Sequence, residues 1–189
     1  MPMPPTLPLL DWRGIFAAGQ HYTEWLESAE SPANAAAMRE AVVSQALPPA
    51  VTQTLSQLER DVYVVAIAED WCGDVVRHVP VLEKLASVSP RLHTCYLNRA
   101  FDPMLFLRFL TNGGEALPKF IFLSESFVEC GSWGPMPLAC RDWIARGKAA
   151  GNVGDARRQV SRLYREDSEK LIVVSELIHH IEIAATARI

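Results

Sequence analysis

The sequence predicts an α/β fold, in which a central sheet of about four strands is flanked by helices. Two observations support this class. An apolar, β-branched run at residues 62–68 passes directly into a segment whose apolar residues recur with helical spacing. Three more runs have strand character, and the segments between them are too short to separate two domains. These runs lie at residues 92–97, 119–123 and 127–130.

The first sixty residues are expected to be helical and to extend the sheet domain at its N-terminus. We therefore divide the chain into a helical extension, residues 1–60, packed on a core of residues 61–189 within a single globular unit. Ser31-Pro32 is a typical helix start, because serine caps the helix and proline suits its first turn. The expected helices of the extension cover residues 10–29, 32–47 and 50–58.

The second half of the chain predicts one short helix, one hairpin and a helical C-terminus. Asp102-Pro103 should begin a helix over residues 104–110. Residues 124–126 are expected to form a hairpin turn between two strands. The C-terminal helices are expected at residues 138–146, 155–165 and 168–187.

Composition favours an ordinary globular protein and argues against several classes of function. With 49% hydrophobic residues in 189, the chain can build one good core. A net charge of −4 and the lack of a basic cluster argue against nucleic acid. The proline-rich start, residues 1–8, does not have the pattern of a signal peptide, and no apolar run is long enough for a membrane span. Four cysteines without an export signal predict a cytoplasmic location.

The candidate active site is Cys72, which follows the apolar run in the segment Glu69-Asp70-Trp71-Cys72-Gly73-Asp74. The periodicity after it places Cys72 where a buried strand meets a helix N-terminus. The helix dipole and free backbone N–H groups at such a position stabilise a thiolate. Acidic neighbours such as Asp74 oppose that effect by repulsion. The position is suited to a reactive sulfur.

These residues resemble the active-site turn of the thioredoxin superfamily, usually written W-C-x-x-C. Pro80 matches the proline that bends the active-site helix in that superfamily, and Pro118 is similar to its cis-proline. The turn, together with Gly131-Ser132-Trp133-Gly134-Pro135, is similar to a bacterial thioredoxin-like subfamily with a helical N-terminal extension. The resemblance covers roughly residues 9–189. It implies a thioredoxin-like mixed sheet, thiol–disulfide exchange at Cys72, and a substrate groove at Leu117-Pro118.

The chain departs from the pattern where a dithiol enzyme has its second cysteine. That position, three residues after Cys72, is Val75, so the chain offers no resolving thiol within the same helical turn. The resemblance would also place a buried acid at Ala66 and its lysine partner near Tyr96. Neither residue can supply a proton relay. Cys72 is therefore either a reactive single thiol or an inert remnant in a binding module.

The other cysteines are expected to be buried structural thiols, although one of them could act as a distant resolving thiol. Cys95 lies in a predicted strand, Cys130 ends another, and Cys140 follows a proline-rich turn. Their spacings match no zinc template, so we expect no metal. No cofactor is predicted.

Neighbouring residues have more modest expected roles. Trp71 should pack beside the thiol, and Gly73 should allow close approach of a substrate peptide. His78 is expected to be a solvated surface histidine. Trp133 is either part of the groove or a core residue.

Three functions remain open at this point. The first is a monothiol redox protein that acts on protein disulfides or glutathione-type thiols through Cys72, with an external thiol that resolves the intermediate. The second is a non-catalytic interaction module that holds an extended peptide beside Pro118. The third is a redox sensor that forms a sulfenic acid.

Overall fold

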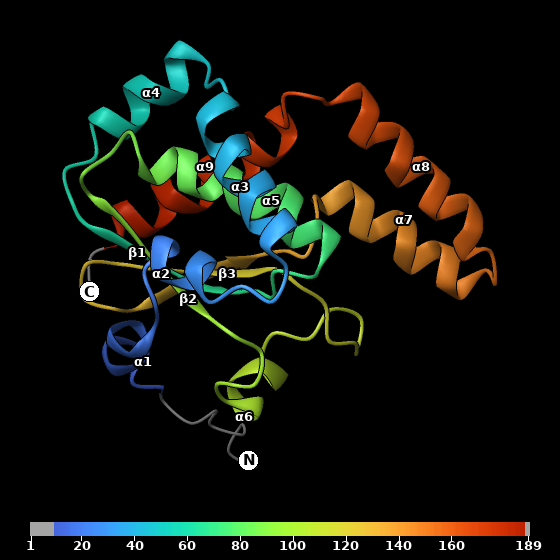
Figure 1. The fold of residues 1–189 in the computed structure, drawn as a ribbon, viewed down its shortest axis with the longest axis horizontal. Coiled ribbons are helices and arrows are strands. Elements are labelled where there is room, and N and C mark those ends of the chain that lie inside the picture. Colours follow the sequence, from blue (N-terminus) through green and yellow to red (C-terminus); the bar gives the residue numbers. More distant parts are fainter. Residues whose placement is uncertain (1–9, 188–189) are drawn as a thin grey trace, which may run out of the picture.

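A four-stranded mixed sheet forms the centre of the protein (Figure 1). The computed structural model describes residues 10–187, so the proline-rich segment at residues 1–8 lies outside the described part. The strands, in the spatial order β2-β1-β3-β4, are β1 (Val62–Ile67), β2 (Leu92–Leu97), β3 (Lys119–Leu123) and β4 (Glu129–Trp133). β1 pairs parallel with β2 and antiparallel with β3, and β3 pairs antiparallel with β4. The predicted α/β class is confirmed.

Helices cover both faces of this sheet (Figure 1). On one face lie α5 (Gly73–Ala86) and α9 (Leu171–Thr186), and α3 (Pro32–Ser44) packs on the outer side of α5. On the opposite face lie α1 (Trp12–Ala18) and α6 (Pro103–Leu107). The N-terminal segment also contains α2 (Tyr22–Glu27), which packs on β2, and α4 (Pro49–Ser56). A paired α7 (Leu138–Ala149) and α8 (Val153–Glu166) project beyond one end of the sheet.

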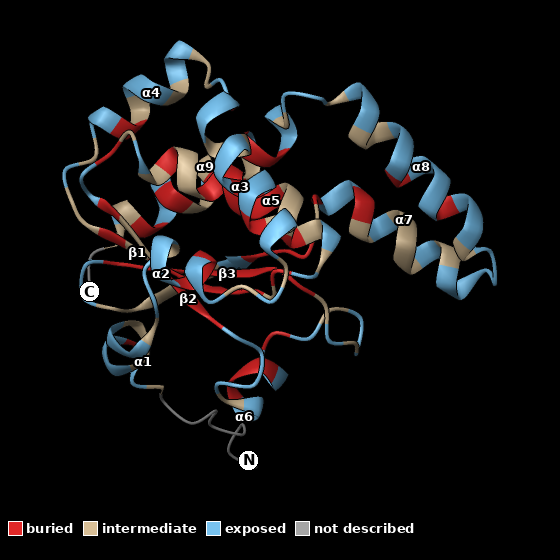
Figure 2. Cartoon of the chain, viewed as in Figure 1, coloured by how far each residue is buried: buried red, intermediate tan, exposed pale blue. Residues whose placement is uncertain are grey.

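The core lies on both sides of β1 and β3 (Figure 2). Side chains of β3 alternate between the two faces. Phe122 stacks on His180 of α9, and Phe120 stacks on Trp133, with ring centroids 5.0 and 5.3 Å apart. The alternation therefore turns Lys119 and Ile121 away from α9, toward the face that carries α1 and α6.

The helix expected over residues 10–29 is instead two helices, α1 and α2. Between them Gln20 pairs with Tyr96 of β2, and each residue donates its backbone N–H to the carbonyl of the other, at 3.0 and 2.9 Å. Gly19 allows this approach, because a Cβ at Gly19 would lie 2.7 Å from Cys95 Sγ. Aromatic residues occur at helical spacing on both sides of this break, so the sequence pattern predicted one continuous helix.

The fourth strand begins two residues later than expected. Phe127 has a φ of +60°, and Ser124 N donates to Val128 O at 2.9 Å, so residues 124–128 belong to the turn. β4 then runs from Glu129 to Trp133, and Trp133 is buried in the core rather than placed after the strand. The helix expected over 104–110 is also shorter, although Asp102 caps it by accepting from Met104 N at 2.9 Å.

Candidate active site

Cys72 is the N-cap residue of α5, at the end of the turn that follows β1. Its amide donates to Glu69 O and its carbonyl accepts from Val76 N, both at 3.0 Å. The side chain is half-buried, and Sγ lies 3.7 Å from the carbonyl oxygen of Leu117. The peptide bond from Leu117 to Pro118 is cis. The structure thus brings together the sulfur and the two groove residues that the sequence singled out.

The turn before Cys72 is held from two sides. The buried carboxylate of Asp70 accepts from the backbone N–H of Ser31, at the start of α3, with a distance of 2.6 Å. Asn34 donates its side-chain amide to Asp70 O at 2.8 Å. Glu69 accepts from Arg99 N at 2.7 Å. The N-terminal helical segment therefore contacts the active-site turn directly, in addition to covering α5.

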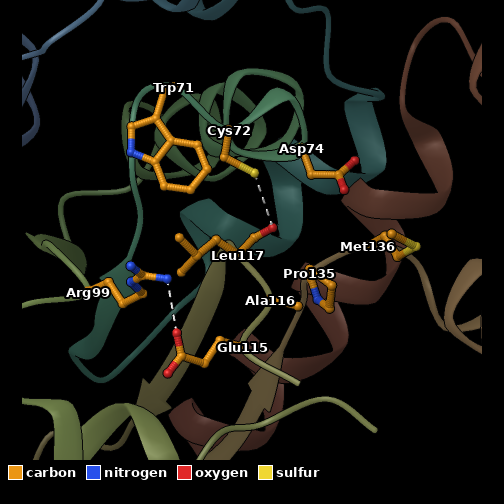
Figure 3. A pocket seen from close by; sticks show the side chains of 9 residues that line it. All are labelled: Trp71, Cys72, Asp74, Arg99, Glu115, Ala116, Leu117, Pro135 and Met136. Carbon is orange, nitrogen blue, oxygen red and sulfur yellow. Dashed lines mark hydrogen bonds and ion pairs between the residues drawn. The ribbon is translucent and has the colours of Figure 1, made fainter. Parts of the chain in front are cut away.

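Cys72 opens into a hollow of about 260 Å³ (Figure 3). In Figure 3 the sulfur points toward the Leu117 carbonyl, the Trp71 ring lies to one side, and the Asp74 carboxylate points away on the other. Trp71 remains 53% exposed, so its ring is available to a bound molecule. We call this hollow the Cys72 pocket. It is lined by Trp71, Cys72, Asp74, Arg99, Glu115, Ala116, Leu117, Pro135 and Met136.

An ion pair and an acid supply the charge of the Cys72 pocket. Arg99 Nη1 donates to Glu115 Oε2 at 3.0 Å, which leaves this pair nearly neutral as a unit. Asp74 accepts a hydrogen bond from the Tyr164 hydroxyl at 3.0 Å. Burial raises the pKa of the Asp74 carboxyl, against the opposing effects of that hydrogen bond and of the Arg77 charge. Asp74 therefore keeps its proton to a higher pH than an exposed carboxyl does.

His78 is fully buried, so the expectation of a solvated surface histidine was wrong. Its ring meets Trp133 and Tyr164 edge-on, and Nε2 lies 3.1 Å from the Tyr164 hydroxyl. Burial lowers the pKa of His78 to about 3, so the ring is neutral at pH 7. Because the Tyr164 hydroxyl donates to Asp74, it accepts from His78 Nε2–H. α8 covers this side of α5, which the local sequence around His78 does not reveal.

Arg77 fixes α8 in this position. Its guanidinium donates to the carbonyl oxygens of Tyr164 and Asp167, at 3.0 and 3.2 Å, and lies over the Tyr164 ring. These hydrogen bonds satisfy carbonyl groups at the C-terminal end of α8. Hydrogen bonds therefore connect His78 through Tyr164 to Asp74, and Asp74 lines the Cys72 pocket.

Two of the three other cysteines are more buried than Cys72, and burial raises the pKa of all three. No disulfide joins any of the four, all of which lie in the described part of the chain. Cys95 and Cys140 are buried, and burial raises their pKa values to about 12 and about 11. Cys130 is half-buried and donates to Val128 O at 3.2 Å; burial raises its pKa as well. Each therefore remains a thiol at neutral pH.

The remaining predicted residues are placed as follows. Val75 is fully buried in the first turn of α5, and Gly73 leaves open space where a Cβ would be. Ala66 and Tyr96 are register partners in the β1–β2 pair, both buried, so the absent acid and lysine would have faced each other across this pair. Trp133 belongs to the core, while Pro135, two residues later, lines the Cys72 pocket.

Sequence reasoning missed Arg99, Glu115, Met136 and Tyr164. Tyr164 is 90 residues from Asp74 in the chain and reaches it through the packing of α8 on α5. No local pattern marks such a contact. Arg99 follows β2 at the same sheet edge as Cys72, since β1 and β2 are parallel, so its position could have been inferred.

Residues 10–187 contain neither a membrane-spanning helix nor a metal-binding cluster. No helix there has both the length and the apolar character to cross a membrane. No group of three or more His, Cys, Asp or Glu side chains in the same part of the chain has an arrangement that could hold a metal ion.

Comparison with known proteins gives a family and a fold. The family model described as "Thioredoxin" matches residues 19–150, well over half of the chain. A protein of unknown function from Pseudomonas aeruginosa has a similar structure, with a TM-score of 0.69 and 20% identity, over 92% of this chain and 98% of that one. An HIV epitope-scaffold protein is also similar, with a TM-score of 0.68 and 17% identity, over the same shares of the two chains. Comparison with curated proteins found no match.

Proposed function

Because the chain belongs to this thioredoxin family, we propose that it is a thiol–disulfide redox protein that acts through Cys72 alone. The observation that carries the proposal is the place of the sulfur. It is half-buried at the N-terminus of α5, opens into a pocket, and lies 3.7 Å from the Leu117 carbonyl. Backbone N–H groups of the first turn of a helix favour a negative charge at this point.

The reaction consists of two thiol–disulfide exchanges. The Cys72 thiolate attacks one sulfur of a substrate disulfide, so that a Cys72–substrate disulfide forms and the other substrate sulfur leaves as a thiolate, which takes a proton. An external thiolate of the glutathione type then attacks the substrate sulfur of this mixed disulfide. The substrate leaves joined to the external thiol, and Cys72 returns as a thiolate. A second external thiol then attacks the disulfide between the substrate and the first external thiol. The substrate leaves as a free thiol, and the two external thiols leave as a disulfide.

An external thiol is needed because the chain offers no suitable internal one. The position one turn along from Cys72 carries Val75. The other three cysteines are partly or fully buried, with raised pKa values. Such a mechanism suits a compartment rich in reduced thiols, such as the cytoplasm.

The Cys72 pocket favours a substrate with an extended backbone. The carbonyl of Leu117 accepts hydrogen bonds beside the sulfur, and the exposed Trp71 ring offers an apolar surface at the rim. A protein disulfide or a glutathione mixed disulfide has both features, a peptide backbone and an adjacent sulfur.

Asp74 is suited to move a proton in this reaction. It lines the pocket, and burial keeps its carboxyl protonated to a higher pH than usual. Tyr164 holds one of its oxygens, so the other can exchange a proton with water in the pocket. Asp74→Asn should remove the fall in rate that follows loss of this proton as pH rises, whereas Asp142→Asn, on α7, should leave the pH–rate profile unchanged.

The test is formation and release of a mixed disulfide. Wild-type protein is treated with oxidised glutathione, and peptide mapping by mass spectrometry locates the adduct. We expect one glutathione on Cys72, removed by added reduced glutathione. Cys72→Ser should lose the adduct, and the control Cys130→Ser should keep it.

Two other results would contradict the proposal. An adduct confined to Cys130 or Cys140 would place the reactive thiol elsewhere. No adduct on any cysteine would favour the alternative, a peptide-binding module, for which the exposed Trp71 is the supporting observation. A sulfenic acid on Cys72 after peroxide, without glutathione exchange, would indicate a redox sensor.

A further inference from the structure

A second hollow, of about 320 Å³, lies between the loop after α6, the start of β3 and α7. It shares no lining residue with the Cys72 pocket. Three cationic residues, Arg108, Lys119 and Arg141, line it, together with the polar residues Thr111, Asn112, Ser132 and Asp142. We call it the Lys119 pocket.

Lys119 is a buried cation with neutral partners. It is 5% exposed, and its ammonium donates to the Thr111 hydroxyl and, at 3.0 Å, to the Gly134 carbonyl. Within residues 10–187 no carboxylate lies within 4.0 Å of its nitrogen. An ammonium has three hydrogens, so one donor is left for another partner. A buried charge without a counter-charge is unfavourable, and an anion would relieve it.

Arg141 is a second cation without a partner. Across the described residues its guanidinium makes no hydrogen bond or ion pair, and its Nε is buried with no acceptor. Its charge is close enough to contribute to lowering the pKa of Lys119 to about 8, although burial is the larger cause. Two like charges thus line one hollow.

The other charged groups nearby do not neutralise this pair. Arg108, also on the wall, is engaged by Glu129 at 2.8 Å. Glu176 accepts from Trp133 Nε1 and Leu138 N. Asp142 also lines the hollow, and its exposed carboxylate offsets one of the two positive charges. The Lys119 pocket therefore keeps a net positive charge of one.

We propose that the Lys119 pocket binds the phosphate group of a small molecule, with Lys119 and Arg141 as its charged ligands. Lys119 and Arg141 exceed the charge of the exposed Asp142, so the hollow attracts an anion such as a phosphate monoester, whose charge is about −1.5 to −2 at pH 7. A guanidinium can bind two phosphate oxygens at once. Thr111, Asn112 and Ser132 provide neutral groups for the remaining oxygen, and the volume is at the lower end of small-molecule sites, roughly 300–1,000 Å³.

The test is calorimetric titration at pH 7 with inorganic phosphate, glycerol phosphate and acetate. We expect both phosphates to bind and acetate to bind at least tenfold more weakly. Tighter binding of glycerol phosphate than of inorganic phosphate would identify a phosphate monoester as the ligand, and the reverse order would identify free phosphate. Acetate that binds as tightly as phosphate would overturn the proposal.

Matched variants locate the site. Arg141→Gln should weaken phosphate binding at least tenfold, and Arg162→Gln, which removes the same charge from the surface of α8, should change it less than twofold. Equal effects of the two would mean nonspecific attraction and contradict the proposal.

Lys119→Met should abolish binding. If that variant fails to fold, the NMR titration of Lys119 in wild type replaces it: phosphate should raise the pKa of Lys119, and an unchanged titration would overturn the proposal. Cys72→Ser should bind phosphate as wild type does, so this result is independent of the redox proposal.

Discussion

The Cys72 pocket and the Lys119 pocket lie on either side of the point where β3 begins, and they are built on opposite principles. The first places an available sulfur beside a backbone carbonyl, with Arg99 and Glu115 paired and the pKa of Asp74 raised by burial. The second has no cysteine on its wall but holds two cations without carboxylate partners. Leu117 lines the Cys72 pocket, and Lys119, two residues later, lines the Lys119 pocket. The comparison shows that one short segment around Pro118 contributes to two hollows of different chemistry.

Gly134 packs tightly against Pro118 and Lys119, so its substitution should have the largest effect. Its carbonyl accepts from Lys119, and a Cβ on Gly134 would lie 2.1 Å from Pro118 O. Its φ of +115° is also unfavourable for other residues. Gly134→Ala should lower the free energy of unfolding by about 3 kcal/mol or more, measured by urea denaturation. The control is Gly73→Ala, where nothing lies within 4 Å of the new Cβ. Its change should stay below about 1 kcal/mol; equal losses in the two variants would contradict the tight packing of Gly134 against Pro118.

Acid should destabilise the protein through His78, which lies behind the Cys72 pocket. Its folded pKa, about 3, is below the model value of 6.5, so the unfolded chain binds more protons between these values. Stability from this group is therefore present above pH 6.5 and is lost as pH falls toward 3. At pH 5 the loss should be about 2 kcal/mol relative to pH 7.

His78→Gln removes this titration and keeps a polar group near Tyr164. The difference in unfolding free energy between wild type and variant should shrink by that amount from pH 7 to pH 5, with His93→Gln, on the surface of β2, as the control. A pH-independent difference would mean that His78 is not buried as a neutral ring.

The contribution of Lys119 to stability should change at alkaline pH. The pKa of Lys119 is lowered from 10.5 to about 8, so the unfolded chain again binds more protons, now between pH 8 and 10.5. Stability from this group rises as pH rises through that window. Wild type should gain about 1 kcal/mol relative to Lys119→Met from pH 8 to pH 9. Phosphate should reduce this gain, and a flat difference without phosphate would show that the lysine is solvated.

The smallest expected effect is a gain of activity in the Cys72 pocket. Val75→Cys places a thiol one turn from Cys72 at a fully buried position. We expect the two thiols to form a disulfide under mild oxidant, as a free-thiol count would show, with a modest rise in insulin reduction. The rise is limited because Ala66 and Tyr96 supply no proton relay. Wild type that is already as active would mean that Cys95, Cys130 or Cys140 resolves the intermediate.

The sequence predicted the sheet and the Cys72 pocket better than the Lys119 pocket, for physical reasons. Strand-to-helix periodicity is local, so β1, α5 and the position of Cys72 could be inferred. The burial of His78 depends on α8, which packs on α5 from 90 residues away. The sequence predicted only that Lys119 begins a strand. No sequence pattern reveals whether a lysine is buried without a counter-charge. The break at Gly19 and the turn at Phe127 depend on single backbone conformations that the surrounding periodicity conceals.

Differential alkylation of the four native cysteines tests the central claim most directly. The protein is treated with iodoacetamide at pH 7, and the labelling rate of each cysteine is followed by peptide mapping. Cys72 opens into a pocket at a helix N-terminus, while burial raises the pKa of Cys130, of Cys140 to about 11 and of Cys95 to about 12. We predict that Cys72 reacts at least tenfold faster than any other. A Cys72 that reacts no faster than Cys130 would contradict its role as the working thiol of this protein.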